Sequence, residues 1–157
     1  MKKIILPALL AMALMESCAK TDTTCPVPNV SVPVAELDSV QQYLTANNIT
    51  NAVLDSRGFY YSISDSGTGK RPTSCSTVLV DYVGQFSNGY IFDRNHAAQF
   101  LLTQVIDGWK LGIPMVKEGG VINLYLPPSL GYGSTGTTTV PANAVLIFTV
   151  NMVVVKS

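Results

Sequence analysis

Charged side chains are scarce in this 157-residue chain. Only 13% of the residues are charged, and ten basic side chains balance ten acidic ones to a formal net charge of zero. Proteins that bind nucleic acid use lysine and arginine to neutralise phosphates. We therefore expect no nucleic-acid partner, and a surface whose solubility rests mainly on serine, threonine, asparagine and glutamine.

Groups for acid–base or metal chemistry are also few. The single histidine, His96, stands in what the pattern predicts to be a loop, and no nucleophile elbow accompanies it. We interpret His96 as a solvated side chain rather than a catalytic base. Cys25 and Cys75 lie far from it in sequence, and these three residues supply too few ligands for zinc. No metal site is expected.

Two glycine-rich stretches match phosphate-binding motifs in letters but not in context. Residues 131–136, "GYGSTG", fit the dinucleotide fingerprint, yet "TTTVPANA" follows in place of a helix and no acidic residue comes after it. In "SGTGKRPTS" the first P-loop glycine is replaced by Ser64, and Arg71 follows the lysine in place of serine or threonine. We predict no nucleotide and no other cofactor.

The N-terminus carries a short apolar run. It extends from Ile4 to Met15, after Lys2 and Lys3. This run is too short to span a membrane stably, and basic residues followed by a short apolar segment are typical of a signal peptide. The sequence therefore predicts a signal at residues 1–17 and export from the cytoplasm.

The end of the signal indicates a lipoprotein. Ser17 and Cys18 resemble a bacterial lipoprotein cleavage site, which predicts a lipid on Cys18, the only membrane contact expected, and a Thr- and Pro-rich tether over residues 18–32. Glu16 departs from this pattern, and a plain secretory signal cut nearby is the alternative. The expected location is the cell envelope, at the outer membrane or in the periplasm.

Cys25 and Cys75 are the two cysteines that remain in the exported chain. An even pair in an oxidising compartment predicts a disulfide. Closing a loop of this length would stabilise the fold by roughly 4 kcal/mol on the chain-entropy model. We expect this bridge to fasten the N-terminal segment to the globular body.

A helix precedes the strands. Apolar residues recur at helical spacing after Pro33, which suits a first helical turn, and Asn47-Asn48 would end the helix. These apolar positions are Leu37, Val40 and Leu44. We assign residues 33–57 to this helix and a connection.

Residues 58–157 have the patterns of strands. Residues 58–64 are rich in aromatic and β-branched side chains, and Asn88-Gly89 predicts a type I′ hairpin turn. Alternation predicts three inward faces: Val78, Val80 and Tyr82; Ile122, Leu124 and Leu126; and Leu146, Phe148, Val150, Met152 and Val154. Antiparallel strands with one short helix between them predict the α+β class, with a curved sheet closing over the helix.

The segment "QVIDGWKLGIPM", residues 104–115, combines helical apolar spacing with poor helix formers. It holds the only tryptophan, Trp109, between Gly108 and Gly112. We expect the glycines to keep the helix slim where the sheet wraps closely around it. Pro114 should end the helix near Ile113 because proline has no N–H to donate. Packing must hold so short a helix more than propensity does.

Four separate blocks resemble FKBP-type peptidyl-prolyl isomerases. They are "VDYVGQFSNGYIFDRN", "QVIDGWKLGIPMVKEGG", "LYLPPSLGYGSTG" and "VPANAVLIFTVNMV", in the order and spacing of that family. The likeness covers residues 58–157 and is closest to small lipoprotein members from Bacteroidetes-like bacteria. It implies an antiparallel sheet of five to six strands around a short helix, and cis–trans isomerisation of Xaa-Pro bonds in exported proteins.

The resemblance also implies a site. Its catalytic positions fall on Asp93, Tyr132 and Ile106, whose backbone N–H would donate to a substrate carbonyl. Its substrate-binding positions fall on Tyr82, Phe92, Val105, Trp109, Val140 and Phe148. The implied partners are proline-containing polypeptides and, by family likeness, rapamycin-type macrolides.

Some positions depart from the family pattern. Ala98 is taken as the site of an aromatic wall residue that some members carry, so one wall of the pocket is expected to be thinner. Arg94 and Asn95 replace two serines, and the loop over the pocket reads "TTTV" and is a residue shorter. Two alternatives therefore stay open: a catalytically weak peptide-binding module or holdase, and a lipid-anchored β-rich protein whose aromatics serve only as core.

Overall fold

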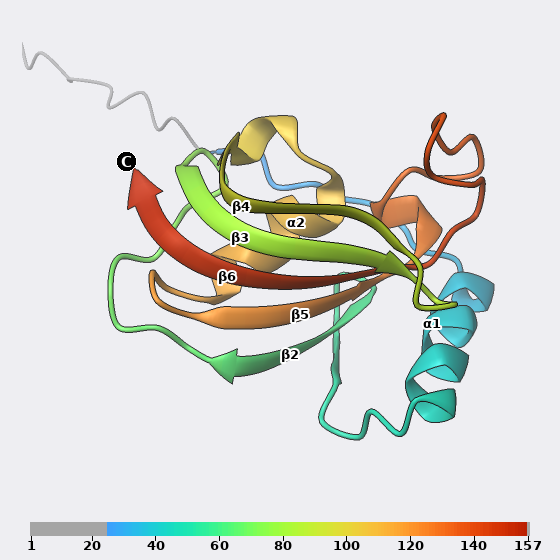
Figure 1. The fold of residues 1–157 in the computed structure, drawn as a ribbon. Coiled ribbons are helices and arrows are strands. Elements are labelled where there is room, and N and C mark those ends of the chain that lie inside the picture. The colour runs from blue at the N-terminus through green and yellow to red at the C-terminus, as the bar shows by residue number, and fades with distance from the viewer. Residues whose placement is uncertain (1–24, 157) are drawn as a thin grey trace, which may run out of the picture.

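The computed structural model describes residues 25–156, and Figure 1 shows their arrangement. Helix α1 (Val34–Ala46) precedes the strands, and helix α2 (Asp107–Gly112) lies between the fourth and fifth of them. The strands are β1 (Val53–Asp55), β2 (Phe59–Asp65), β3 (Thr77–Phe86), β4 (Ile91–Leu101), β5 (Val121–Leu126) and β6 (Leu146–Lys156). Short 3-10 helices are η1 (Leu102–Gln104), η2 (Ile113–Met115) and η3 (Pro128–Leu130).

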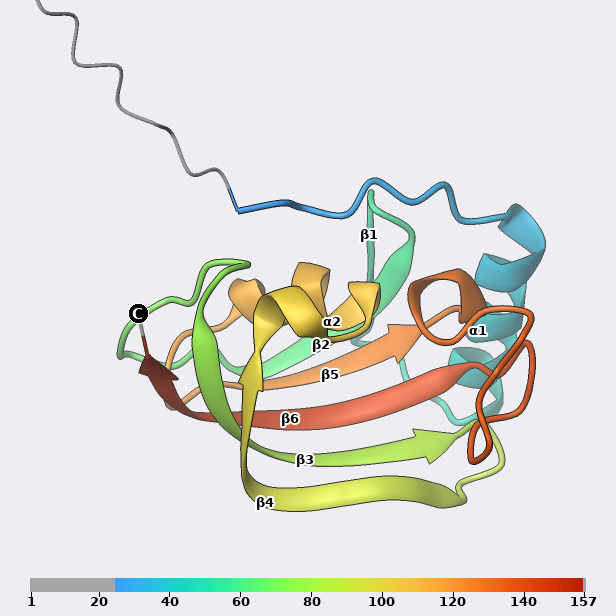
Figure 2. The same cartoon turned by 90° about the horizontal axis from the view of Figure 1, so that it is seen from above.

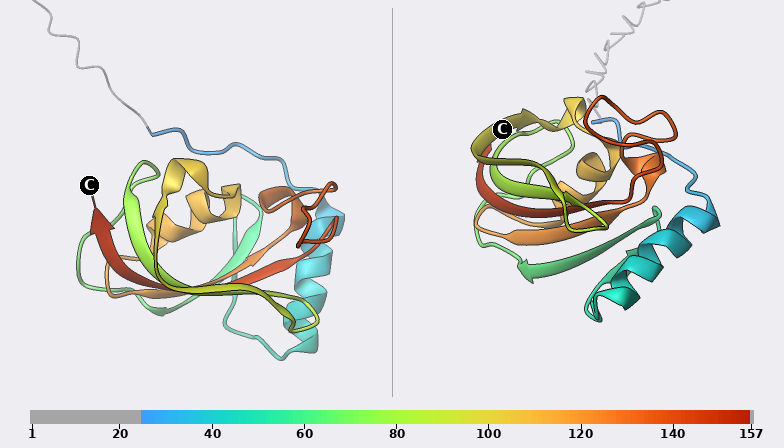
Figure 3. Two further views of the ribbon diagram at one scale, coloured as in Figure 1. Left: turned by 45° about the horizontal axis from the view of Figure 1, so that its top comes forward. Right: turned by 45° about the vertical axis from the view of Figure 1, so that its right-hand side comes forward.

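One antiparallel sheet contains all six strands in the order β1-β2-β5-β6-β3-β4. The sheet is strongly curved, and α2 lies on its concave side (Figures 2 and 3). The predicted α+β architecture of a curved sheet around a short helix is therefore confirmed. The short strand β1 was not anticipated and forms from residues assigned to a connection.

Helix α2 lies against the sheet at very short range. A Cβ added at Gly108 would come 2.4 Å from a methyl carbon of Leu126, and one added at Gly112 would come 2.5 Å from Leu124. Both leucines are fully buried on the concave face of β5. The expectation that these glycines allow close wrapping is confirmed. The helix ends at Gly112 and continues as η2 through Pro114, as the missing proline N–H predicts.

Helix α1 covers the opposite face of the sheet near the ends of β5 and β6. Tyr125 and Ile147 point to this face because side chains alternate along a strand. They form a second buried cluster with Val40 and Leu44 of α1. The helix predicted after Pro33 is confirmed, and it ends as predicted at Asn47, with Asn48 in the left-handed region at φ 54°.

The alternation of β6 changes phase near its end. The prediction that Val154 faces the core with Met152 is wrong, because Val154 is half-buried and Val155 is buried in its place. The register between β3 and β6 shifts between Leu79 and Val80. An extra residue on one strand moves every later side chain to the other face.

The β3–β4 hairpin turn differs from the predicted type I′. That type needs positive φ at both central residues, but of Asn88 and Gly89 only Gly89 has it, at 83°. The Gly89 N–H donates to the Phe86 carbonyl at 2.9 Å, and the Phe86 N–H donates to the Tyr90 carbonyl at 2.9 Å. This is the pattern of a three-residue loop that closes on a left-handed glycine.

His96 lies inside β4 and not in a loop, which corrects that part of the prediction. The β3–β4 register shifts between Val80 and Tyr82, and Ala97 has φ 53°, so His96 occupies a bulge. Its Nδ1 lies 2.7 Å from Oδ1 of Asp81, and its side chain is 87% exposed. The interpretation of His96 as a solvated side chain is confirmed.

The predicted disulfide joins Cys25 to Cys75, with 5.4 Å between the two Cα atoms. It holds the start of the described chain beside the loop that precedes β3. The signal at residues 1–17 and the lipidation site at Cys18 lie outside the described residues. Between residues 25 and 156, no helix has the length and apolar character to cross a membrane.

Candidate active site

A cavity of about 250 Å³ opens on the concave side of the sheet, between β3, β4, β6 and the start of α2. It is lined by Tyr82, Phe92, Asp93, Phe100, Gln104, Val105, Ile106, Trp109, Tyr132 and Phe148. A wider depression of about 530 Å³ lies at the β4 bulge, where Asn95 and His96 are exposed. The smaller cavity has the aromatic enclosure that recognition of an apolar ring requires.

Trp109 forms the aromatic floor of the cavity. Its ring centroid lies 5.3 Å from each of the rings of Tyr82, Phe100 and Phe148, with interplanar angles of 88°, 80° and 81°. Edge-to-face contacts of this kind place the positive edge of one ring against the negative face of another. Its Nε1–H is buried and has no hydrogen-bond partner within residues 25–156. The indole is thus fixed by rings and not by polar bonds.

A tyrosine–carboxylate pair stands at the edge of the cavity. The Tyr82 O–H donates to Oδ2 of Asp93 at 2.6 Å, the short distance typical of a bond to a charged acceptor. Burial raises the pKa of Tyr82, and the hydrogen bond to Asp93 raises it further. The phenol therefore stays protonated, and its bond fixes the direction of the Asp93 carboxylate.

Ile106 lines the cavity and immediately precedes α2. Its carbonyl accepts the N–H groups of Trp109 at 3.0 Å and of Lys110 at 3.2 Å, so the helix begins just after it. The N–H of Ile106 lies ahead of the helix and takes no part in these bonds. Val105 precedes it in extended conformation and also lines the cavity.

Tyr132 reaches the cavity from the loop that follows η3, and the residue is 38% exposed. Burial raises the pKa of Tyr132, and the charge of Asp93 adds to this shift. The loop is fastened by the N–H of Gly133, which donates to the Pro128 carbonyl at 2.9 Å. Tyr132 therefore offers a protonated hydroxyl at the mouth of the cavity.

Helix α1 contributes to the anchorage of this loop. Oε2 of Glu36 accepts the backbone N–H of Ser129 at 2.8 Å, and both carboxylate oxygens lie 2.7 Å from the Ser129 hydroxyl. Ser129 belongs to η3, which leads directly into the loop of Tyr132. The loop and α1 also lie side by side in Figures 2 and 3.

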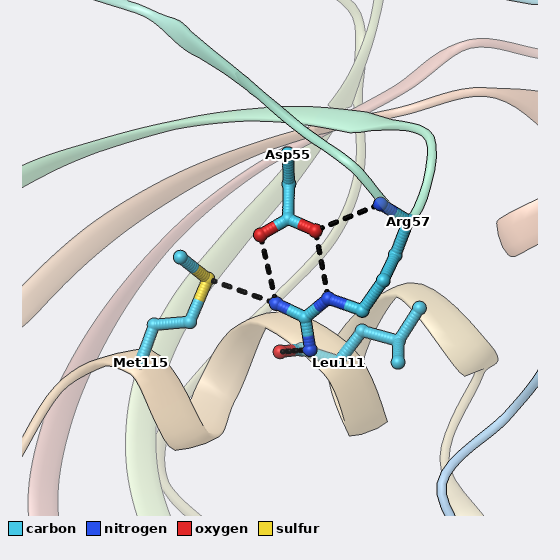
Figure 4. A network of polar contacts seen from close by, with 4 residues as sticks. All are labelled: Asp55, Arg57, Leu111 and Met115. Atoms are coloured by element: carbon cyan, nitrogen blue, oxygen red, sulfur yellow. Dashed lines mark hydrogen bonds and ion pairs between the residues drawn. The ribbon is translucent and has the colours of Figure 1, made fainter.

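Helix α2 is anchored at its other end by Arg57 (Figure 4). The guanidinium binds Asp55 through two bonds of 2.7 and 2.9 Å and donates to the carbonyl of Leu111 at 3.2 Å. It also lies 3.7 Å from the sulfur of Met115. The side-chain hydrogen bonding between Asp55 and Arg57 lowers the pKa of Asp55 and raises the pKa of Arg57. A charged donor thus meets a carbonyl in the last turn of α2, where the helix dipole favours positive charge.

Eight of the nine site residues inferred from the family resemblance line the cavity, and Val140 does not. Val140 is 4% exposed, packs in the main core, and has its N–H bonded to the hydroxyl of Thr137 at 3.0 Å. The structure brings together Asp93, Tyr132, Ile106, Tyr82, Phe92, Val105, Trp109 and Phe148. Their individual roles in catalysis stay predictions.

The expectation of a thinner wall at Ala98 is wrong, because Phe100 supplies the aromatic ring. Phe100 contacts Tyr82 with centroids 5.7 Å apart, as well as Trp109. It is the only aromatic residue between Asp93 and Trp109, which was the signal available in the sequence. Gln104, in η1, is the other lining residue that the sequence analysis missed.

A curved antiparallel sheet around a short helix, with an aromatic cavity between them, defines an FKBP-like domain. A profile of the FKBP-type peptidyl-prolyl cis-trans isomerase family matches residues 69–153, which is more than half of the chain. The chain belongs to this family.

Relatives and solved structures agree with this assignment. The chain is 36% identical over 121 residues to the isomerase FkpA of Aeromonas hydrophila, covering 74% of this chain and 45% of the relative. It is 37% identical over 120 residues to the isomerase Mip of Coxiella burnetii, covering 73% and 52%. The chain thus spans about half the length of these relatives.

The crystal structure of FkpA from Escherichia coli superposes with a TM-score of 0.71 at 31% identity, covering 78% of this chain and 60% of that one. A peptidyl-prolyl cis-trans isomerase from Pseudomonas syringae gives a TM-score of 0.70 at 24% identity. It covers 82% of this chain and 99% of its own, and at that identity it shows a shared fold alone.

Proposed function

We propose that the protein is a peptidyl-prolyl cis-trans isomerase that acts on proline-containing polypeptides. The observation that carries this proposal is the cavity floored by Trp109, enclosed by aromatic rings and bordered by the Tyr82–Asp93 pair. Proline is the residue whose ring fits an apolar aromatic pocket and whose preceding peptide bond isomerises slowly. Membership of the isomerase family supports the same activity.

The reaction requires no base or nucleophile because no covalent bond breaks. Rotation about the amide bond loses resonance and meets a barrier of about 18–20 kcal/mol. Each tenfold acceleration needs about 1.4 kcal/mol of preferential binding to the twisted amide. The twisted form has less charge separation than the planar forms, so a cavity that excludes water favours it. Phe92, Trp109 and Phe148 would hold the proline ring in such surroundings.

Polar groups at the rim would orient the substrate chain. The N–H of Ile106 would donate to a substrate carbonyl, and the Tyr132 hydroxyl would donate to another. Asp93 would act on the amide electrostatically, in the direction fixed by the Tyr82 hydroxyl. These groups hold the two ends of the peptide while the bond between them rotates.

The activity can be tested by NMR exchange spectroscopy on a short Xaa-Pro peptide. The purified protein should accelerate exchange above the uncatalysed rate, whose time constant is tens of seconds. Asp93→Asn should lower kcat/KM by about tenfold, whereas Asp38→Asn, on the exposed side of α1, should not. Peptide binding without acceleration by the wild type would instead support the holdase alternative, whose motivation at Ala98 is weakened by Phe100.

Macrolides of the rapamycin type form a second class of proposed ligand. The support is the family resemblance together with the aromatic cavity, which would receive one ring of such a molecule. A macrolide should then slow the catalysed exchange in proportion to its occupancy, and the fluorescence of the single tryptophan, Trp109, should report binding.

We place the isomerase domain at residues 58–157 and the protein in the cell envelope, attached by a lipid on Cys18. The lipoprotein-like signal and the disulfide of Cys25 and Cys75 support export. Metabolic labelling with a fatty-acid analogue in a bacterial host should mark the wild type and not Cys18→Ser. If neither the wild type nor Cys18→Ser is labelled, the N-terminus is a plain secretory signal and Cys18 carries no lipid.

A further inference from the structure

Three aromatic rings are stacked from the β3–β4 hairpin toward the cavity. The rings of Tyr90 and Phe86 lie 6.1 Å apart with an interplanar angle of 11°, and those of Phe86 and Phe92 lie 4.7 Å apart at 21°. Phe92 then meets Phe148 edge-to-face at 5.6 Å, inside the cavity. We call Tyr90, Phe86 and Phe92 the aromatic ladder.

The ladder is continuous with the cavity in which the proline is proposed to bind. Phe92 lines that cavity. A Cβ added at Gly84 would come 2.8 Å from the Phe92 ring, so this ring lies over the concave face of β3. An open groove lined by residues 89–94 follows the edge strand β4 and shares Phe92 and Asp93 with the cavity. A polypeptide that leaves the cavity on this side would therefore pass over the ladder.

Tyr90 is unusually exposed for a residue held so firmly. The residue is 65% exposed. Its N–H donates to Oδ1 of Asn88 at 2.9 Å, and its carbonyl accepts the N–H of Phe86 at 2.9 Å. These bonds fix the backbone at Tyr90, and its ring stacks on Phe86. An aromatic side chain has few rotatable bonds, so it loses little conformational entropy when a ligand covers it. These properties favour a binding role over incidental exposure.

We propose that Tyr90 and Phe86 form an additional subsite for an apolar side chain of the substrate polypeptide. The proposal rests on the proposed function, because the proline in the cavity sets the register. An extended chain advances about 3.3 Å per residue, and the two steps of the ladder are 4.7 and 6.1 Å. Together these steps set the longest span of the ladder, so the subsite would receive a side chain no more than about three residues from the proline.

A substrate chain fits this surface better than a second copy of the protein. One exposed aromatic side chain offers roughly 150–250 Å², whereas a stable interface buries about 800 Å² per partner. The groove follows β4, which is an edge strand of the sheet formed by residues 25–156, so backbone groups on its outer side have no neighbouring strand from that part of the chain. An extended peptide can pair with such groups while its side chain reaches the ladder.

Matched peptides without tryptophan test the subsite. One peptide carries phenylalanine three residues before the proline, a second carries it three residues after, and each has a serine counterpart. Trp109 fluorescence gives Kd, and NMR exchange gives kcat/KM. In the wild type, phenylalanine should bind about fivefold more tightly than serine at one of the two positions, as expected for one aromatic contact.

Variants assign the effect to the ladder. The ratio of Kd for the serine peptide to Kd for the phenylalanine peptide should fall to near one in Tyr90→Ser. It should persist in Tyr90→Phe, because ring stacking and not the hydroxyl produces this advantage. Leu54→Ser, which removes an exposed apolar side chain from the opposite edge strand β1, should keep the advantage.

Two results would overturn the subsite. One is equal binding of phenylalanine and serine peptides at both positions in the wild type. The other is an advantage that Tyr90→Ser leaves unchanged. A peptide that ends next to the proline cannot reach Tyr90, so its exchange rate tests the proposed isomerase activity separately.

Discussion

Two tyrosine hydroxyl groups near Asp93 are kept in their protonated, hydrogen-donating form. Burial raises the pKa of both Tyr82 and Tyr132, and the carboxylate of Asp93 acts in the same direction on each. Ionisation of either phenol would place a second negative charge beside Asp93. The cavity therefore has hydroxyl donors whose availability does not change around neutral pH.

We expect catalysis to be insensitive to tyrosine ionisation between about pH 7 and pH 9. A group whose folded pKa is raised favours the folded state in its protonated form. That contribution is complete below the ordinary tyrosine pKa of about 10 and is lost as the pH rises above it. The catalysed rate of peptide exchange should stay constant between about pH 7 and pH 9, and the free energy of unfolding should fall above about pH 10.

Tyr82→Phe is the control for this pH dependence. It removes the most strongly shifted phenol, so its stability should fall less above pH 10 than that of the wild type. A difference spectrum between the two proteins isolates the Tyr82 titration. Ionisation of Tyr82 below its ordinary pKa would contradict the assignment.

Which residues line the cavity could be predicted only in part. Tyr82, Trp109 and Phe148 occupy motif positions at fixed spacing, so the family resemblance places them directly. Phe100 was missed because the bulge around His96 and Ala97 changes the count along β4. Val140 lies outside the lining set because its backbone bonds to Thr137 hold this loop residue in the core, which the sequence does not indicate.

At the scale of elements, helix α2 depends on space that only glycine leaves. We expect Gly108→Ala to destabilise the protein by about 1–3 kcal/mol, the usual range for overpacking. The new methyl group would lie 2.4 Å from a carbon of Leu126, which is fully buried and cannot easily move. Denaturant unfolding measures the lost stability. The exchange assay should also show a lower kcat/KM, because Trp109, which forms the floor of the cavity, is the residue next to Gly108.

A second substitution separates overpacking from helix propensity. Alanine favours a helix over glycine, so an isolated α2 would gain from this change. Leu126→Val shortens the obstructing side chain, and the double variant should lose less stability than the two single losses added together. Strict additivity would mean that Gly108 and Leu126 do not meet.

Strand patterns predicted the faces of the sheet but not its bulges. Period-two alternation predicted the buried faces of β3 and β5 because their inward positions alternate without interruption. A bulge inserts one extra residue into a strand and is not marked by any apolar pattern. The sequence, which has valine at both positions, therefore does not indicate that Val155 is buried in place of Val154. The hairpin turn type was missed for a similar reason, since Asn-Gly is compatible with more than one loop length.

The bond between α1 and η3 predicts a remote effect on the Tyr132 loop. Glu36→Ala should lower kcat/KM by about threefold to tenfold, because it removes charged hydrogen bonds worth about 1.5–3 kcal/mol in holding Ser129. Hydrogen exchange of the Gly133 amide, which is bonded to Pro128 in the same loop, should accelerate. This second measurement distinguishes loop positioning from a general loss of stability.

Asp38→Ala is the matched control for Glu36→Ala. Asp38 is an exposed acidic residue of the same helix, so its removal changes the helix charge equally. It should leave both the Gly133 exchange rate and kcat/KM unchanged. If both variants changed the Gly133 exchange rate and kcat/KM equally, the carboxylate of Glu36 would be stabilising α1 through its charge and not holding the Tyr132 loop.

At the scale of the whole molecule, the N-terminal segment braces the domain from outside the region matched to the family. It attaches through Cys25 to the loop before β3, through Glu36 to the Tyr132 loop, and through Arg57 to the end of α2. The cysteine count and the predicted export together predicted the first attachment. The other two join residues 93 and 54 positions apart, and no local periodicity records contacts over such separations.

The disulfide is the one covalent part of this brace, and its loss should reduce stability more than activity. Replacing Cys25 and Cys75 together by serine frees a loop with a sequence separation of 50. The free energy of unfolding should fall by about 2–4 kcal/mol, through the larger entropy of the unfolded chain. None of the cavity-lining residues lies in the closed loop, so kcat/KM at 25 °C should change less than twofold while the melting temperature falls. Reduction of the wild type should reproduce both results, because it breaks the same bond without introducing serine. If reduction instead abolished exchange activity below the melting transition, the bridge would be shaping the cavity itself, and the N-terminal segment would belong to the catalytic unit and not merely to its support.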